Sequence, residues 1–514
     1  MGLSRLSEVR AAGMSTVASQ FESTARLFPT SPALVEGERV TTYAQLSGQA
    51  RRIASWLDAH GVQRGDRVAL LAENSGDYLA LMLGCAFRGC ILACQNWRLL
   101  PHELKHCIDL VAPKLMMASS RYAGTLEECG YDRASVRVLD DTLRAEWAAA
   151  SDQSTFPVDP EDPLIILYTS GTTGLPKGAV ISHRAELARN AAWRTSYRLA
   201  PEDTFVAWTP LYHMGGTDHA LATLMQGGKV IVMDGFDADR LAQIAVTEPL
   251  GWFVVMPGTV DRAIAALKAT GKPVVGVKVC GVMADLIPRH QIAELSALVN
   301  APFANTFGST ETGSPPCSGD LLPIGVVPDK LPKTMSSFCE LKLVDEQDQP
   351  VGRGVPGEAA VRGPTLFSGY WNAPETNADD FRGGWFHMGD ILVQHDDGTF
   401  DFVDRAKYMI KSGGENIYPA EIEGVLLGDK RVQEAAVVRQ ADPQWGEVPV
   451  AFVAREDDSI GAVELAALCR EKLAGYKQPK GFHFIDFDAF PRSASGKVQR
   501  HELQARLEAQ LAQK

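Results

Sequence analysis

The feature that most constrains the fold of this chain is a repeated alternation of short apolar runs with amphipathic helical patterns. Residues 43–60 carry apolar side chains at helical spacing, residues 67–72 form a short apolar run, and residues 77–87 are again helical in pattern. A strand followed by a helix, repeated in this order, is typical of a sheet with parallel strands. The sequence therefore predicts an α/β fold.

The same alternation returns later in the chain. We expect strands at 204–210, 229–233, 252–256 and 274–280, separated by helices at 237–247 and 260–270. From about residue 337 the pattern changes to short β runs divided by Gly and Pro, at 338–344, 358–362 and 399–403. This pattern predicts several α/β sheets and a small β subdomain in one large N-terminal domain.

The last part of the chain has a different pattern. Helices are expected at 421–427 and 463–473, and strands at 432–439 and 449–455, before a basic Ser/Gly-rich loop and an exposed helix. This mixture predicts a small α+β domain that follows the large N-terminal domain.

Composition limits the classes of partner. The net charge of −13 argues against nucleic acid or an anionic membrane as a bulk partner. No stretch reaches the about 18 apolar residues of a membrane span, and no secretory signal is evident. The nine cysteines match no zinc spacing, so we expect buried free thiols and a cytoplasmic location, without an integral membrane segment.

The segment 168–178, Tyr-Thr-Ser-Gly-Thr-Thr-Gly-Leu-Pro-Lys-Gly, follows the apolar strand expected at 164–167. Glycines let backbone N–H groups approach an anion, hydroxyls add donors, and a lysine adds positive charge. The spacing matches neither a Walker loop nor a dinucleotide fingerprint. The alternatives are a polyphosphate-binding loop and a Gly/Thr-rich surface turn.

Four further segments lie downstream in a fixed order. They are Thr-Phe-Gly-Ser-Thr-Glu at 306–311, Gly-Trp-Phe-His-Met-Gly-Asp at 384–390, Asp-Arg-Ala-Lys at 404–407 with Gly-Gly-Glu-Asn-Ile-Tyr-Pro at 413–419, and Pro-Arg-Ser-Ala-Ser-Gly-Lys at 491–497. Together the five segments resemble the adenylate-forming superfamily of acyl-CoA synthetases, peptide-synthetase adenylation domains and luciferases. The resemblance covers about residues 21–502 and is nearest to acyl-CoA synthetases.

The resemblance implies a two-step reaction. A carboxylate attacks the α-phosphorus of ATP to give an acyl-adenylate and pyrophosphate, and a thiol then displaces AMP. It also implies a large AMP-binding domain at 1–404, a hinge at 405–407 and a mobile lid domain at 408–514. The implied cofactors and substrates are ATP, Mg²⁺ and coenzyme A.

The resemblance assigns residues to the nucleotide. The implied phosphate loop comprises Thr169, Ser170, Gly171, Thr172, Thr173, Gly174 and Lys177. Glu311 is the implied Mg²⁺ ligand, with Thr172 as a second oxygen. The implied adenine segment comprises Asn305, Thr306, Phe307, Gly308, Ser309 and Thr310.

The resemblance also implies residues that contact the ribose and residues that belong to the hinge and lid. Asp390 is expected to accept both ribose hydroxyls, and Arg405 to reach the ribose or α-phosphate unless it serves only as a linker salt bridge. Met388 departs from the threonine usual at that position, which removes a hydroxyl. The remaining implied residues are Lys497 as catalytic cation, Lys407 as hinge, and Gly413 and Gly414 at the thiol tunnel.

The acid-binding pocket is less defined. His213 is the implied gate between the acyl pocket and the thiol tunnel, although a lone histidine is more often structural. The segment 280–284 departs from the usual small-residue pattern through Val282 and Met283. Glycines 215, 216, 281 and 313 are expected to leave room for a fatty or bulky apolar acid. Lys and Arg are missing from the pocket segments, which disfavours diacids.

The leading hypothesis is therefore an AMP-forming acid–CoA ligase. No carrier-protein pattern follows the lid, so we expect a free thiol acceptor. The rivals are a stand-alone adenylation enzyme that loads a carrier protein and a catalytically degenerate homologue acting as a binding protein. The expected partners are a small carboxylic acid, ATP and coenzyme A, without nucleic acid, and a homodimer is compatible with the sequence.

Overall fold

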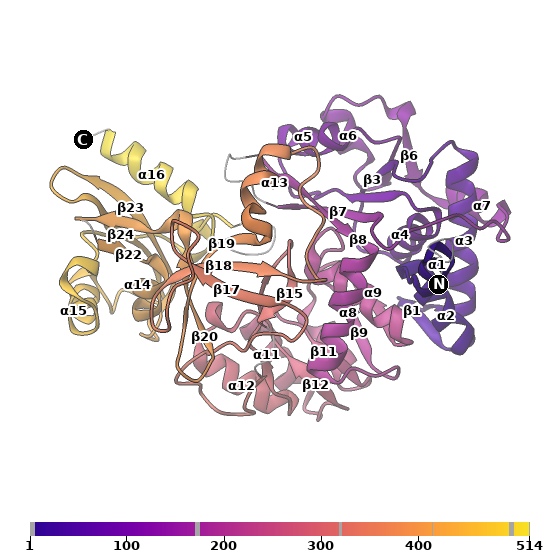
Figure 1. The fold of residues 1–514 in the computed structure, drawn as a ribbon. Coiled ribbons are helices and arrows are strands. Elements are labelled where there is room, and N and C mark those ends of the chain that lie inside the picture. The colour runs from indigo at the N-terminus through magenta and orange to yellow at the C-terminus, as the bar shows by residue number, and fades with distance from the viewer. Residues whose placement is uncertain (1–5, 170–174, 318–320, 414, 493–497, 513–514) are drawn as a thin grey trace.

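A computed structural model describes residues 6–169, 175–317, 321–413, 415–492 and 498–512. It contains two large sheets, two smaller ones in the same N-terminal part, and a separate C-terminal sheet (Figure 1). The α/β prediction is confirmed. Among the described residues, no helix combines the length and apolar character needed to cross a membrane.

A six-stranded sheet holds the phosphate segment. Its strand order is β6-β5-β3-β4-β7-β8, and all neighbours are parallel except the antiparallel pair β7 and β8. The strands are β3 (Arg67–Leu71), β4 (Ile91–Cys94), β5 (Leu115–Ser119), β6 (Val136–Leu139), β7 (Pro163–Thr169) and β8 (Lys177–Ser182).

An eight-stranded sheet lies beside it, in the order β16-β13-β12-β11-β9-β10-β1-β2. The strands are β1 (Pro32–Glu36), β2 (Arg39–Thr42), β9 (Thr204–Ala207), β10 (Lys229–Val232), β11 (Leu250–Phe253), β12 (Val277–Cys280), β13 (Phe303–Ala304) and β16 (Leu321–Leu322). Strands β1, β10, β9, β11, β12 and β13 run parallel, and the edge strands β2 and β16 are antiparallel.

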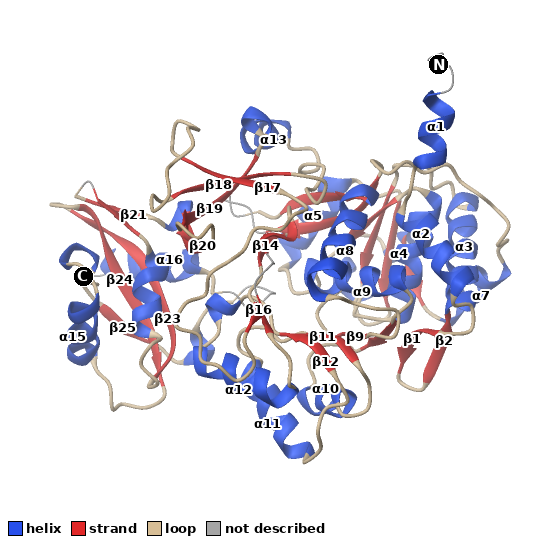
Figure 2. Ribbon diagram, turned by 60° about the horizontal axis from the view of Figure 1, so that its bottom comes forward, coloured by secondary structure: helices blue, strands red, loops and turns tan. Residues whose placement is uncertain are grey.

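Helices cover both large sheets (Figure 2). They are α2 (Val17–Leu27), α3 (Tyr43–Ala59), α4 (Gly76–Arg88), α5 (Pro101–Val111), α6 (Ala123–Glu128), α7 (Asp141–Ala149), α8 (His183–Tyr197), α9 (Met214–Gln226), α10 (Ala238–Ala245), α11 (Val260–Thr270) and α12 (Arg289–Val299), whereas α1 (Leu6–Gly13) projects away from the sheets (Figure 2). Helix α4 is buried on almost every side, which explains its nearly continuous apolar sequence. It starts at the Ser75 cap and ends at Gly89, whose φ is +74°.

The ribose segment belongs to a four-stranded antiparallel sheet. Its strands are β17 (Glu340–Val344), β18 (Gly357–Arg362), β19 (Phe386–Gln394) and β20 (Phe400–Arg405), and α13 (Pro374–Asp380) lies before β19. A short hairpin of β14 (Phe307–Ser309) and β15 (Gly313–Cys317) carries Glu311 in its turn.

The C-terminal sheet is covered on both faces. Its strands are β21 (Ile410–Ser412), β22 (Glu415–Ile417), β23 (Val432–Asp442), β24 (Gly446–Arg455) and β25 (Phe482–Phe484), with helices α14 (Pro419–Leu426), α15 (Ala462–Lys472) and α16 (Arg500–Ala512). Along β23, Ala435 and Val437 pack with residues of α14 and α15, whereas Ala436 and Val438 pack with residues of α16. This two-residue alternation is the pleat of a strand buried on both faces.

Most predicted elements occur within a few residues of their expected positions. The ends of some strands differ: the strand expected at 252–256 is β11 (Leu250–Phe253), and the strand expected at 204–210 ends at Ala207. Val254 and Val255 are buried although they lie outside β11, so hydrophobicity alone extends the run beyond the sheet. Several strands were not predicted, among them β5, β6, β8 and β19.

Candidate active site

The hairpin of β7 and β8 places Thr169 directly opposite Lys177. The buried residues of β7 anchor this strand pair in the six-stranded sheet. The predicted loop residues Ser170, Gly171, Thr172, Thr173 and Gly174 lie outside the described residues. Thr169 and Lys177 therefore mark the two ends of the proposed phosphate loop.

Lys177 faces the segment before β19. Its Nζ lies 4.3 Å from the centroid of the Tyr370 ring and 4.0 Å from Oδ2 of Asp380. Burial raises the pKa of Asp380 above its ordinary value, against the lowering effect of Lys177. A lysine with one long ion pair and an aromatic neighbour is a suitable partner for an incoming phosphate.

Glu311 is held by the same segment. Its carbonyl accepts a hydrogen bond from Phe367 N at 2.8 Å, and its Oε1 accepts one from Tyr370 Oη at 2.7 Å. Burial, and next the charge of Glu311, raises the pKa of Tyr370 well above its ordinary value, so this phenol remains a donor. Tyr370 thus contacts both Lys177 and Glu311, although the sequence analysis did not identify it.

The chemistry of this corner fits Mg²⁺. Glu311 is a largely buried carboxylate with a neutral hydrogen-bond donor, and Mg²⁺ typically takes one or two protein oxygens together with phosphates and waters. Glu311 would hold the ion together with Thr172, which lies outside the described residues. The bound ion would neutralise charge on the triphosphate.

The predicted adenine segment, residues 305–310, follows β13 and includes β14. Asn305 is fully buried; its Nδ2 donates to the carbonyl of Pro332 at 2.5 Å, and its Oδ1 has no hydrogen-bond partner among the described residues. Such an oxygen fits an exocyclic amine. Thr306 Oγ1 accepts from Met283 N at 3.3 Å, and the ring of Phe307 lies 5.9 Å from that of Phe402.

The rest of this segment forms a tight turn. A Cβ on Gly308 would lie 2.0 Å from the carbonyl oxygen of Gly313, so the hairpin requires glycine there. Ser309 N donates to Thr312 Oγ1 at 2.9 Å, and Ser309 Oγ accepts from Glu311 N at 3.2 Å. These bonds fix the backbone that presents Glu311. The carbonyl of Thr310 accepts from a buried side chain, Arg189.

Asp390 and Arg405 pair across β19 and β20. They are register partners, and Arg405 Nε lies 2.7 Å from Asp390 Oδ1, which is buried. The charge of Asp390, and next that of Glu311, raises the pKa of Arg405 despite the opposing effect of burial. The proposed ribose residue Asp390 and the proposed metal ligand Glu311 therefore act on the same guanidinium. Met388 packs into the main hydrophobic core instead of presenting a polar group.

His213 has a structural role in addition to its proposed one. It caps α9, and its Nδ1 accepts a hydrogen bond from Gly215 N at 3.1 Å. Three of the four pocket glycines do not leave open space. A Cβ would lie 2.5 Å from the Pro210 carbonyl at Gly216, 2.0 Å from the Phe303 ring at Gly281 and 2.8 Å from Arg189 at Gly313. The expectation that these glycines make room for the acid is wrong, since they permit close packing.

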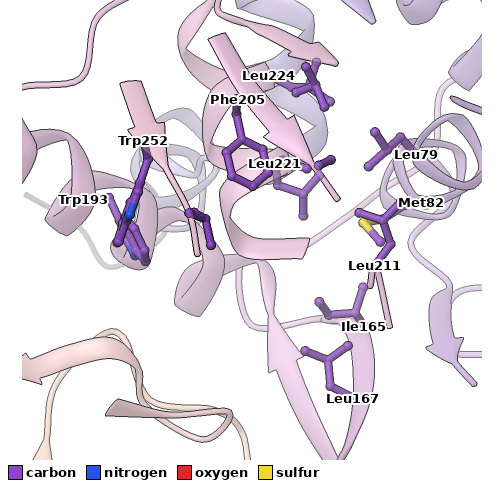
Figure 3. Close-up of a cluster of buried hydrophobic side chains, with 14 of the residues drawn as sticks. Leu79, Met82, Ile165, Leu167, Trp193, Phe205, Leu211, Leu221, Leu224 and Trp252 are labelled. Atoms are coloured by element: carbon purple, nitrogen blue, oxygen red, sulfur yellow. The ribbon is translucent and has the colours of Figure 1, made fainter. Parts of the chain in front are cut away.

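An aromatic cluster is formed by Trp193 of α8, His219 of α9 and Trp252 of β11. Figure 3 shows Trp193 and Trp252 side by side, and their ring centroids are 3.9 Å apart. The ring of His219, on α9, lies 3.8 Å from Trp193. The indole of Trp252 donates to the Gly281 carbonyl at 2.8 Å, so the cluster also contacts the segment that carries Met283. The cavity that these rings line has a volume of about 10 Å³.

A short turn, Ala406–Tyr408, connects the ribose-side strand β20 to the C-terminal sheet, and the predicted lid residues follow this turn. Lys407 is exposed, its carbonyl accepts from Arg439, and its Nζ lies 5.0 Å from the Tyr408 ring centroid. Gly413 N donates to the Trp445 carbonyl at 2.8 Å. Gly414 and Lys497 lie outside the described residues.

Comparison with known proteins identifies the family. The family described as AMP-binding enzyme matches residues 21–371, and the AMP-binding enzyme C-terminal domain matches residues 421–497. A feruloyl-CoA synthase of Amycolatopsis sp is 35% identical over 498 residues, covering 94% of this chain and 97% of the relative. A fatty acid–[acyl-carrier-protein] ligase of Streptomyces coeruleorubidus is 32% identical over 522 residues, covering 95% of each chain.

A solved structure extends the comparison to the fold. The o-succinylbenzoate CoA synthetase from Bacillus subtilis, in complex with its acyl-adenylate intermediate, superposes with a TM-score of 0.82 at 26% identity, covering 94% of this chain and 97% of that one. The chain belongs to the AMP-binding enzyme family, as an adenylate-forming ligase of the acyl-CoA synthetase class.

Proposed function

We propose that this protein is an AMP-forming carboxylic acid–CoA ligase acting on an apolar acid. The observation that carries the proposal is the assembly of Lys177, Glu311, Asp390 and Arg405 from separate segments around Tyr370. These groups supply what an adenylation site needs, which is positioning and electrostatic stabilisation at the triphosphate and ribose.

In the first half-reaction, a carboxylate oxygen of the acid attacks the α-phosphorus of ATP, and the bond from that phosphorus to the pyrophosphate oxygen breaks. Lys177 would stabilise the β- and γ-phosphates, and Asp390 would hold the ribose. Lys497 would stabilise charge at the reacting oxygens. In the second half-reaction, the thiol sulfur attacks the acyl carbon, and AMP leaves with the bonding electrons.

The proposed lid motion divides these steps between two orientations of residues 408–514 about Lys407. The last strand of the ribose sheet ends at Arg405 and the first strand of the C-terminal sheet begins at Ile410, so the connection between the sheets is short. Hinges typically use a few residues at the ends of elements. Gly413 and Gly414 would then border the thiol path.

The acid is proposed to be apolar and compact. Arg189 is the buried cation nearest the glycine turn, and its Nε and both terminal nitrogens already donate to protein partners. It is therefore unsuited to bind a second carboxylate. The aromatic cluster of Trp193, Trp252 and His219 contacts Gly281 of the proposed pocket segment and leaves a cavity of only about 10 Å³. We propose that this cluster closes the acid pocket and favours an aryl or short acyl group over a long chain.

The acceptor thiol is proposed to be that of coenzyme A. One relative described above is a CoA synthase, and another is a carrier-protein ligase, which makes carrier loading the alternative. The nine buried free cysteines support the proposed cytoplasmic location. A homodimer stays a prediction, tested by sedimentation.

The test separates the half-reactions. Acid-dependent ATP–pyrophosphate exchange should appear with wild-type protein, and AMP release should then require coenzyme A and not a carrier protein. Lys497→Ala should lower exchange by about 10²–10³-fold while sparing thioester formation from supplied acyl-adenylate. If no acid in a panel of aryl and fatty acids supports ATP–pyrophosphate exchange, the proposal is overturned. If AMP release requires a carrier protein instead of coenzyme A, the alternative is favoured.

A further inference from the structure

Arg189 connects three segments from the interior of the protein. It lies on α8 and is fully buried. Its Nε donates to the carbonyl of Thr365 at 3.0 Å, one terminal nitrogen donates to the carbonyl of Thr310 at 3.0 Å, and the other donates to Asp218 Oδ2 at 3.1 Å. A guanidinium can serve three acceptors in different directions because its donors are fixed in one plane.

The charge of Arg189 is balanced within the core. Asp218, on α9, is also buried and forms the ion pair. Glu186 lies one helical turn before Arg189, and burial, followed by the charge of Asp218, raises the pKa of Glu186 well above its ordinary value. The neutral acid is therefore favoured at Glu186. Arg189 and Asp218 remain as a one-to-one pair, the arrangement that a buried charge requires.

Two of the three acceptors flank Glu311. Thr310 directly precedes Glu311, and Thr365 lies two residues before Phe367, whose N–H donates to the Glu311 carbonyl at 2.8 Å. Arg189 therefore fixes both backbone segments that hold this carboxylate. The residue that follows the turn of the β14–β15 hairpin, Gly313, also packs directly against Arg189. Gly313 has a φ of +71°, and a Cβ there would lie 2.8 Å from Arg189 Cδ.

We propose that Arg189 is a positioning residue for the Mg²⁺–ATP side of the active site, acting through the backbone on either side of Glu311. The inference rests on the proposed function, because it takes Glu311 as the metal ligand. Arg189 itself does not touch the nucleotide. Groups that orient a metal ligand typically change metal affinity by about 10–100-fold when they are replaced.

The decisive variant is Arg189→Lys. Lysine keeps the charge beside Asp218, but a single ammonium cannot reproduce the planar fork that reaches both carbonyls. We expect equilibrium dialysis to show MgATP binding weakened by about 10–100-fold, with binding of AMP, measured without metal, within about twofold of wild type. The Mg²⁺ concentration needed for half-maximal ATP binding should rise in parallel.

A matched control is Arg88→Lys. Arg88 is a buried arginine on α4 that pairs with Asp58 at 2.9 Å, and none of its interactions in the described part of the chain involves a proposed site residue. It should leave MgATP and AMP binding unchanged. If Arg189→Lys does not fold, the double variant Arg189→Gln with Asp218→Asn removes the fork without leaving an unpaired buried charge, and it should show the same selective loss.

The outcomes distinguish this inference from the proposed function. Equal weakening of MgATP and AMP binding, or no weakening of either, would overturn the positioning role. Glu311→Gln is measured alongside. If Glu311→Gln changes the Mg²⁺ dependence and Arg189→Lys does not, only the inference fails. If Glu311→Gln leaves the Mg²⁺ dependence unchanged, the metal-ligand assignment fails, and the inference fails with it.

Discussion

Tyr370 Oη donates a hydrogen bond to Glu311 Oε1 at 2.7 Å, across 59 positions of sequence. The same tyrosine ring lies under Lys177 Nζ. The proposed metal and phosphate sides of the site are therefore linked by the side chain of Tyr370. This link has a direct consequence for the metal dependence of adenylation.

Replacing Tyr370 by Phe should raise the Mg²⁺ requirement by about tenfold, because the carboxylate of Glu311 loses the donor that orients it. The measurement is a Mg²⁺ titration of ATP–pyrophosphate exchange. Tyr131→Phe is the matched control, since Tyr131 Oη donates to Asp109 at 2.7 Å on the exposed surface. Equal Mg²⁺ requirements in the two variants would contradict the role of Tyr370.

Removing part of the aromatic cluster that we propose closes the acid pocket should change the choice of acid. Trp193→Ala opens space beside Trp252 and His219, whose rings lie 3.9 Å and 3.8 Å from Trp193. We expect the ratio of kcat/KM for an eight-carbon acid to that for a short acid to rise by about tenfold, the lower end of the effect of one methylene in an apolar pocket. Ile264→Ala, a core truncation on α11, controls for general destabilisation. An unchanged ratio would place the acid elsewhere.

The positions of helices and strands could be predicted from the sequence better than the contacts between them. Helices such as α3 and α11 were predicted closely because their caps and apolar faces are local. Strand β19 was missed because Gly389 and Asp390 interrupt its apolar pattern, and only its pairing with β18 and β20 defines it.

The residues that organise the site were also beyond the reach of sequence alone. Tyr370 and Arg189 lie outside the five motifs, and their partners are distant in the chain. A buried arginine on α8 has the same local signal as a solvated one, because its partners come from other elements. Close packing reversed the interpretation of Gly216 and Gly281, since a glycine in a sequence does not reveal whether the space beside it is filled.

A pH effect is expected at the connection between the two sheets. Asp404 Oδ2 accepts from Ala420 N at 2.8 Å, and burial raises the pKa of Asp404 to about 6, with Arg500 opposing and Glu423 reinforcing the shift. The folded protein therefore binds this proton more tightly than the unfolded chain does. The stability contributed by the group is full below pH 3.8 and is lost as pH rises to about 6.

Asp404→Asn should remove this dependence. Between pH 4 and 7, the free energy of unfolding of wild type minus that of the variant should fall by up to ~3 kcal/mol and then level off. Urea unfolding at half-unit pH steps measures the difference. Asp401→Asn, at a partly exposed pair with His395, provides the control. A flat difference between wild type and Asp404→Asn would mean that Asp404 titrates normally in the folded protein.

The hinge assignment leads to the sharpest test of lid motion. Proline fixes φ near −65° and restricts the residue before it, so Lys407→Pro should hold the turn at Ala406–Tyr408 in one conformation. We expect acyl-adenylate to form in a single turnover, while transfer of supplied adenylate to coenzyme A falls by at least about 100-fold. Ala462→Pro is the matched proline control, because Ala462 is the first residue of α15, where proline is tolerated. If Lys407→Pro transfers the acyl group at the wild-type rate, the rotation does not occur about Lys407, and the domain boundary must lie elsewhere between β20 and β21.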